Sequence, residues 1–141
     1  MLPELAPGIR ISVTGLEAEQ MRLDVAAHNL TNTQTTRDID GGPYQRRVVV
    51  FSSVMNDAMA DTTRNLGGVQ VSEIVKEEKA PQNKYMPWHP DADDEGFVSL
   101  PDISPVLEML DIMTASRAYE ANLNAIKQGK TMFDSTLDLL R

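Results

Sequence analysis

The stretch LDVAAHNLTNTQTTRDIDGGPYQRR, residues 23–47, changes from a helical to an irregular pattern halfway along. Its first part is rich in alanine and leucine, which favour helix, and its last part contains the turn signal Gly-Gly-Pro. Between them lies a run of Asn and Thr side chains, which compete for backbone hydrogen bonds and favour helix ends. The sequence therefore predicts that a helix ends here and that a differently folded module follows.

Apolar residues upstream of this junction recur at seven-residue intervals. Leu16, Leu23 and Leu30 share one face of a helix if residues 9–30 are helical. Residues 106–140 repeat the pattern, and the apolar positions of their stripe are Ile112, Tyr119, Leu123, Ile126, Phe133, Leu137 and Leu140. Ser104 followed by Pro105 is typical of a helix start. We expect two long terminal helices whose stripes serve helix packing and assembly.

The middle of the chain has a β pattern. Residues 46–54, 69–75 and 96–100 are rich in β-branched and aromatic residues, and four prolines disfavour helix across most of 80–103. We therefore expect an α+β fold in which long N- and C-terminal helices pack as a coiled-coil-like pair and enclose a small, irregular β module. The expected parts are a mobile lead over 1–8, a terminal-helix core domain over 9–36 and 104–141, and a β-rich module with a proline-rich loop over 37–103.

Charge and composition restrict the possible functions. The chain has 13 Lys and Arg against 21 Asp and Glu, a net charge of -8, which disfavours nucleic acid and anionic membrane surfaces as partners. It has no cysteine, which excludes Cys-based metal sites and nucleophiles. No long apolar run predicts a membrane span, and the N-terminus lacks the pattern of a cleaved signal peptide. Since no nucleophile is placed beside a base, we expect neither an enzyme nor a cofactor.

One acidic loop, DADDEGFVSLPD (91–102), matches part of a calcium-binding pattern. The carboxylates fall at positions 1, 3, 5 and 12 of such a loop, and they are Asp91, Asp93, Glu95 and Asp102. Against calcium, Pro90 and Pro101 oppose the flanking helices, and position 12 has the shorter Asp. His89 lies nearby, but no second histidine completes a transition-metal set. A solvated acidic turn is favoured, and a calcium-binding interaction module is the alternative.

Several motifs resemble those of bacterial flagellar rod and hook axial proteins. AAHNLTNTQTT (26–36) is similar to the signature that closes their N-terminal helix, and the shared positions include Asn29 and Asn32. MLDIMTASRAYEANLNAIKQGKTMFDSTLDLL (109–140) resembles their C-terminal helix, and its core motif includes Arg117, Glu120 and Asn122. The middle segments GGPYQRR (41–47, with Gly42, Pro43 and Tyr44), GVQVSEIV (68–75) and HPDADDEGFVSLPD (89–102) are similar to the proximal rod members.

The resemblance implies a structural subunit. Such subunits leave the cell through the flagellar type III export apparatus without a cleaved signal peptide and assemble helically into the periplasmic rod, which transmits torque. The implied partners are other copies of the chain, other rod proteins, and basal-body components at the ring and export-gate junction. Asn29, Asn32 and the threonines would end the first helix and bond adjacent protomers. Another rod or hook paralogue is the alternative within the family.

Overall fold

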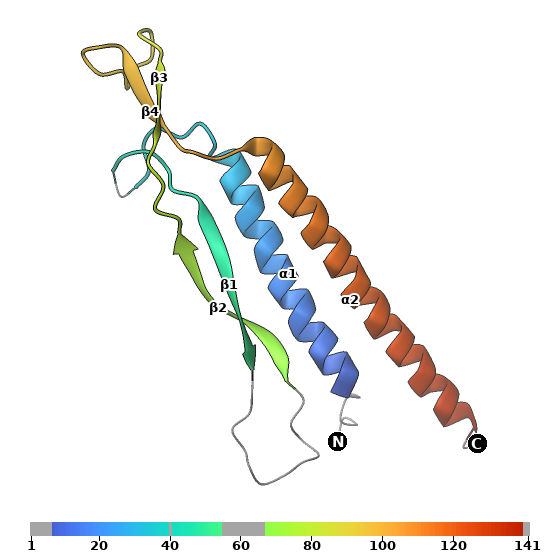
Figure 1. The fold of residues 1–141 in the computed structure, drawn as a ribbon. Helices are drawn as coiled ribbons and strands as arrows, with labels where there is room; N and C mark the ends of the chain where they lie inside the picture. The colour runs from blue at the N-terminus through green and yellow to red at the C-terminus, as the bar shows by residue number, and fades with distance from the viewer. Residues whose placement is uncertain (1–6, 40, 55–66, 140–141) are drawn as a thin grey trace.

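The computed structural model describes residues 7–39, 41–54 and 67–139. Helix α1 spans Pro7–Thr31 and helix α2 spans Pro105–Leu139; between them come strands β1 (Arg47–Val54), β2 (Gly68–Lys76), β3 (Gln82–Tyr85) and β4 (Phe97–Leu100). The helices lie side by side and antiparallel, so that the start of α1 and the end of α2 lie at the same end of the pair (Figure 1). The predicted α+β fold with two packed terminal helices is confirmed.

The first helix begins earlier than the sequence pattern predicted. Pro7 and Gly8 were expected in the mobile lead, but they form the first turn of α1. Proline is compatible with the first helical position because the N–H it lacks would have no carbonyl partner there. Residues 1–6, the rest of the expected lead, lie outside the described residues, as do Leu140 and Arg141.

The two helices approach closely through small residues. A Cβ atom on Gly15 would lie 3.0 Å from Nδ2 of Asn122, and one on Gly129 would lie 3.0 Å from Cγ1 of Ile9. Ala115 is fully buried. Gly129 costs about 1 kcal/mol of helix stability relative to alanine. The close approach of Ile9 explains why a glycine occupies that position.

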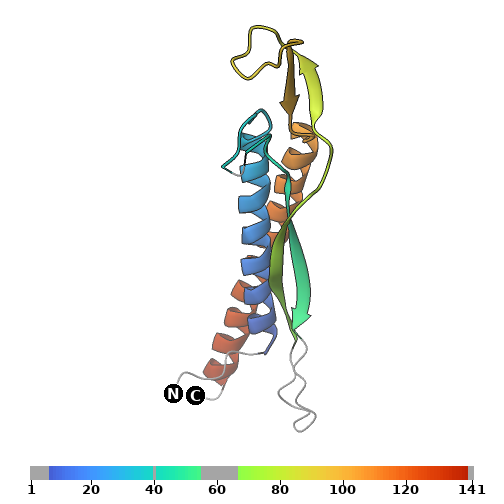
Figure 2. The ribbon, with the colours of Figure 1, turned by 90° about the vertical axis from the view of Figure 1, so that its left-hand side faces the viewer.

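Strands β1 and β2 form an antiparallel hairpin that packs along α1. The register runs from Arg47 opposite Lys76 to Val54 opposite Gly68, with an irregularity between Val50 and Phe51. Figure 1 shows α1 between this hairpin and α2, and Figure 2 shows the hairpin running beside α1. The backbone N–H of Val69 donates to Oγ1 of Thr14 on α1 at 3.2 Å. This bond attaches the hairpin to the first half of the helix.

A second hairpin, β3–β4, projects beyond the helix pair at the end where α1 stops (Figure 1). Three of the four strands fall in segments that the sequence pattern predicted, but β3 does not. Its residues, Gln-Asn-Lys-Tyr, are all exposed and lack an apolar alternation. β3 is a strand because it pairs with β4, and its own residues carry no strand pattern that could have predicted it.

The buried core of the single chain is small. Among the described residues, the buried hydrophobic side chains are Ala18, Val25, Ala26, Tyr44, Val98 and Ala115. Many larger apolar side chains on α2 and on the β1–β2 hairpin are exposed instead. The tightest packing therefore lies along α1 and at the end of the helix pair that faces the second hairpin.

Candidate functional site

A polar cluster with a buried centre joins the end of α1, the start of α2 and the start of β1. We call Asn29, Tyr44, Arg46, Glu77 and Glu108 the junction cluster. Asn29 and Glu108 are each 1% exposed and Tyr44 is 3% exposed. Buried polar groups are costly unless they are hydrogen-bonded, so the partners of these side chains decide whether the cluster stabilises the fold.

Asn29 is the centre of the junction cluster. Its Nδ2 donates to the backbone oxygen of Arg47 at 2.8 Å and to Oε2 of Glu108 at 3.0 Å. Its Oδ1 accepts from the hydroxyl of Tyr44 at 2.9 Å and from the backbone N–H of Arg47 at 2.9 Å. The amide therefore uses both donors and both acceptor positions. One side chain on α1 thereby holds the turn before β1, the first residue of β1 and the first turn of α2.

Glu108 connects the junction cluster to the β module through a charge pair. Its Oε1 accepts from Nε of Arg46 at 2.7 Å, and Arg46 also donates to Oε2 of Glu77 at 3.3 Å. Glu108 lies in the first turn of α2, where the helix dipole favours a carboxylate. Burial disfavours the charged guanidinium, but the hydrogen bond and the charge of Glu108 outweigh it, so the pKa of Arg46 is raised above its ordinary value.

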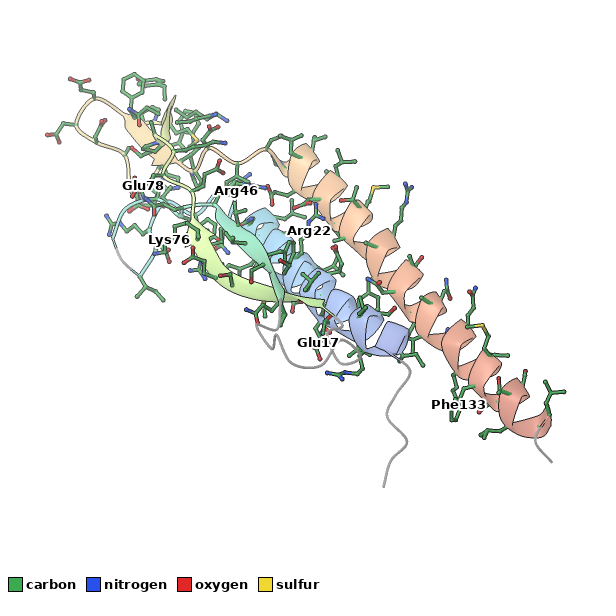
Figure 3. All side chains as sticks on the ribbon, turned by 60° about the horizontal axis from the view of Figure 1, so that its bottom comes forward. Glu17, Arg22, Arg46, Lys76, Glu78 and Phe133 are labelled. Atoms are coloured by element: carbon green, nitrogen blue, oxygen red, sulfur yellow. The ribbon has the colours of Figure 1, made fainter. Side chains whose placement is uncertain are left out.

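Figure 3 shows Arg46 where the β module meets the helix pair, at the opposite end of that pair from Phe133. Arg22 lies between the helices, and its Nη2 donates to Oδ1 of Asp111 on α2. This second pair lies near the junction cluster and connects the same two helices.

Tyr44 makes the junction cluster sensitive to alkaline pH. Burial is the largest cause that raises the pKa of Tyr44 above its ordinary 10.0, while the charge of Arg47 lowers it. Because the folded pKa lies above the unfolded one, the stability that Tyr44 contributes is fully present below about pH 10 and is lost as pH rises through the folded pKa.

We expect Tyr44→Phe to remove this pH dependence. Urea unfolding followed by circular dichroism between about pH 8 and about pH 11 should show a larger loss of stability in the wild-type chain than in the variant. At the lower pH the variant should be less stable by about 1 kcal/mol, because Oδ1 of Asn29 loses a donor. Equal losses in the two proteins across the pH range would show that Tyr44 does not contribute in this way.

The polar run after Asn29 terminates α1. Oγ1 of Thr31 and Nδ2 of Asn32 donate to the backbone oxygen of His28 at 2.9 and 2.8 Å, and Oγ1 of Thr33 donates to that of Leu30 at 3.1 Å. These bonds add hydrogen-bond donors at the end of α1, where the last carbonyls have no partner within the helix; the oxygen of His28 also accepts from the backbone N–H of Asn32 at 3.2 Å. Asn29 has a different role from the one the sequence predicted, because its side chain joins elements instead of capping the helix.

The remaining family-motif residues divide between turns and the surface of α2. Gly42 adopts a φ of +91°, which favours glycine, in the turn that positions Pro43 and Tyr44. Arg117 and Glu120 are exposed on α2, and Asn122 faces Gly15 on α1. The structure thus brings Asn29 and Tyr44 into one cluster and places Arg117 and Glu120 outside it.

The predicted helix-packing residues range from half-buried to exposed in the single chain. The half-buried positions are Leu16, Leu23, Leu30, Ile112, Tyr119, Leu123 and Ile126. Phe133 and Leu137 are 43% and 48% exposed, and Leu140 lies outside the described residues. The far part of the α2 stripe therefore has little cover from its own chain.

Three of the four carboxylates of the acidic loop have separate partners. Asp91 accepts from Oγ1 of Thr36 and pairs with Arg37, each at 2.8 Å. Oδ1 of Asp93 accepts from backbone N–H groups of its own turn, while Asp102 accepts from Gln82. Over residues 7–39, 41–54 and 67–139, no three acidic or histidine side chains are grouped to hold a metal ion. The loop leads into β4 rather than into a helix, unlike the calcium-binding pattern.

Sequence reasoning missed Arg46 and Glu108. A glutamate four residues after the helix-starting Ser104 is common in first turns, so its position alone did not distinguish it from an exposed residue. Its burial depends on Asn29 and Arg46, which lie 79 and 62 positions earlier. No helix within the described part of the chain is long and apolar enough to cross a membrane.

Comparison with known proteins gives a consistent result. Residues 94–139 match the family described as flagellar basal body rod FlgEFG protein C-terminal. The chain is 40% identical to the flagellar basal-body rod protein FlgC of Borreliella burgdorferi, over 97% of this chain and 98% of that protein. It is 34% identical to the FlgC of Bacillus subtilis, over 93% of this chain and 95% of that protein. It is 40% identical to the FlgC of Aquifex aeolicus, over 91% of each chain.

Proposed function

The chain belongs to the FlgC family of flagellar basal-body rod proteins, and we propose that it builds the proximal part of the rod by helical assembly and transmits torque there. It is a structural rod subunit of the flagellar basal body. In this role, the contacts between subunits carry the function. The junction cluster would keep each subunit rigid, because torque must pass from the helix pair to the β module without loosening it.

The observation that carries this proposal is the large apolar surface left open by the single chain. The total accessible surface of the chain, polar and apolar together, is 10616 Å², against about 7,200 Å² expected for a compact monomer of its 15.6 kDa mass, so the chain is more open than a compact monomer. Exposed large apolar side chains occur on α2 from Val106 to Leu139. A chain with so much open apolar surface reaches a normal degree of burial when neighbouring subunits cover it.

The end of the helix pair opposite the junction cluster offers one such contact. A groove of about 530 Å³ lies between the first turns of α1 and the last turns of α2, and Ile9, Gly129 and Phe133 contribute to its lining. Leu137 continues the same stripe one turn further along α2. We assign the predicted helix-packing residues, together with this groove, to contacts between protomers in the axial tube.

The proposed partners follow from this arrangement. They are other copies of the chain, neighbouring rod proteins, and the components at the ring and export-gate junction, with the flagellar type III export apparatus as the route to the assembly site. The proposed location is the part of the rod that lies within the periplasm. We assign Arg117 and Glu120, which are exposed on α2, to lateral contacts between subunits.

The test is a rescue experiment with a strain that lacks this chain. The wild-type chain should restore rods, and electron cryomicroscopy of isolated basal bodies should place α1 and α2 along the axial tube. Leu137→Asp should leave the free energy of unfolding within about 1 kcal/mol of wild type, because the side chain is exposed, yet abolish rod formation. A buried interface tolerates an unpaired carboxylate poorly.

Ser135→Asp is the matched control. Ser135 is also exposed, and it lies about 200° around the helix from Leu137. This variant should restore rods at a level close to wild type. Normal rods with Leu137→Asp would remove that residue from the interface. Absence of the chain from rods restored by the wild-type gene would contradict the proposed function itself.

A further inference from the structure

The tip of the β3–β4 hairpin displays exposed aromatic side chains. Trp88, the single tryptophan of the sequence, is 80% exposed, and Tyr85 and Phe97 are 61% and 39% exposed. The rings of Tyr85 and Phe97 meet edge to face with centroids 5.4 Å apart. We call residues 85–97 the tip loop. A large aromatic side chain standing in water gains little for the free subunit, so its position suggests a contact with another molecule.

The tip loop is held in one shape by its own hydrogen bonds. The backbone N–H of Met86 donates to the oxygen of Gly96, and that of Asp93 donates to the oxygen of Phe97, each at 2.9 Å. Oδ1 of Asp93 accepts from the N–H groups of Glu95 and Phe97 at 3.1 and 2.7 Å. Gly96 has a φ of +84°, and a Cβ there would lie 2.9 Å from the Tyr85 ring. The loop conformation is thus well determined.

A further pair of contacts fastens the tip loop to the body of the subunit. Oδ2 of Asp91 accepts from Oγ1 of Thr36, and Oδ1 of Asp91 pairs with Nε of Arg37, each at 2.8 Å. Both partners lie in the segment that follows α1. A rigid, anchored loop loses little conformational entropy on binding, and a tryptophan presented in this way is typical of the residues that carry most of the energy of an interface.

The charge of the tip loop restricts what can bind. Residues 85–97 contain four acidic residues and neither lysine nor arginine. Asp91 and Asp93 are engaged as described, whereas in the part of the chain that the structure describes no hydrogen bond or ion pair involves the side-chain carboxylates of Asp94 and Glu95. The complementary surface is therefore basic. At this loop a second copy of the chain is the less suitable partner, because the chain offers 13 basic against 21 acidic residues.

We propose that the tip loop docks onto a basic segment of a different polypeptide in the basal body, with Trp88 as the anchor and Asp94 and Glu95 as the carboxylates that pair with its lysine or arginine side chains. An arginine or lysine over the indole ring would add a cation–π contact. This inference rests on the proposed function, since it takes the chain to be a rod subunit, and it adds a surface and the chemistry of its partner.

The experiment places a photoreactive benzoylphenylalanine at Pro90, an exposed position of the tip loop, in the full chain within assembled basal bodies. Irradiation should join the chain to a different polypeptide, at a segment rich in lysine or arginine as read by mass spectrometry. Trp88→Ala in the same background should weaken the affinity of the contact by up to about 30-fold. The crosslink yield should fall as a result. Asp94→Lys should lower the crosslink yield several-fold by charge repulsion.

Glu78→Lys is the control, because Glu78 is exposed and lies outside the tip loop (Figure 3). The substitution changes the charge by the same amount as Asp94→Lys. It should leave the crosslink unchanged. A crosslink to a second copy, a crosslink to a segment without basic residues, or no crosslink in basal bodies that contain the chain would each overturn this inference alone. Absence of the chain from the basal bodies would overturn the rod assignment and this inference with it.

Discussion

Asn29→Asp should lower the free energy of unfolding by about 3–5 kcal/mol, the largest effect that we expect from a single substitution. Aspartate has nearly the shape of asparagine, so packing is preserved. The change replaces the Nδ2 donor, which lies 3.0 Å from Oε2 of Glu108, with an oxygen that cannot donate when ionised. Two carboxylates would then face each other in a site where both side chains are 1% exposed.

Urea unfolding of the purified full chain, followed by circular dichroism, measures this effect. Asn32→Asp is the matched control, because Nδ2 of Asn32 donates to the backbone oxygen of His28 at an exposed position. Its cost should stay below about 1 kcal/mol, including the unfavourable charge at a helix C-terminus. Equal destabilisation by the two variants would mean that Asn29 acts as a helix cap and that the junction cluster has no special role.

Glu108→Ala should lower the free energy of unfolding by about 2–4 kcal/mol. The substitution removes the acceptor for Nε of Arg46 at 2.7 Å and leaves Nδ2 of Asn29 with one partner instead of two. Arg46 keeps its contact with Glu77 at 3.3 Å, which limits the loss. Since Glu108 joins α2 to both α1 and the β module, we also expect faster amide hydrogen exchange at the start of α2.

Glu120→Ala on the same helix is the control for Glu108→Ala. Glu120 is exposed, so its removal should change the free energy of unfolding by less than about 0.5 kcal/mol. If the Glu108 variant were as stable as the Glu120 variant, the buried charge pair would contribute nothing beyond the apolar contacts around it. That result would agree with cases in which a buried ion pair merely offsets its own desolvation.

Local sequence patterns predict most of the elements of this fold. The seven-residue apolar stripe, the Ser104-Pro105 helix start and the Asn and Thr run each depend on neighbours within about one or two helical turns. For this reason local patterns predict the two helices, the end of α1 and three of the four strands. The prediction missed β3 and ended the N-terminal lead too late, because strand pairing and the tolerance for Pro7 depend on the surrounding structure.

The junction cluster required the folded chain. Asn29 meets Tyr44 across 15 positions and Glu108 across 79, and no local pattern predicts which of many polar residues will share a buried site at such separations. The same holds for helix packing, where Gly15 and Gly129 mark the close approach because side chains of the partner helix, Asn122 and Ile9, occupy the space that a Cβ would need. Sequence thus specified the elements through short-range propensity and periodicity. Long-range packing selected which polar side chains are buried together, because burial makes each unpaired polar group costly and only a mutually bonded set is stable there.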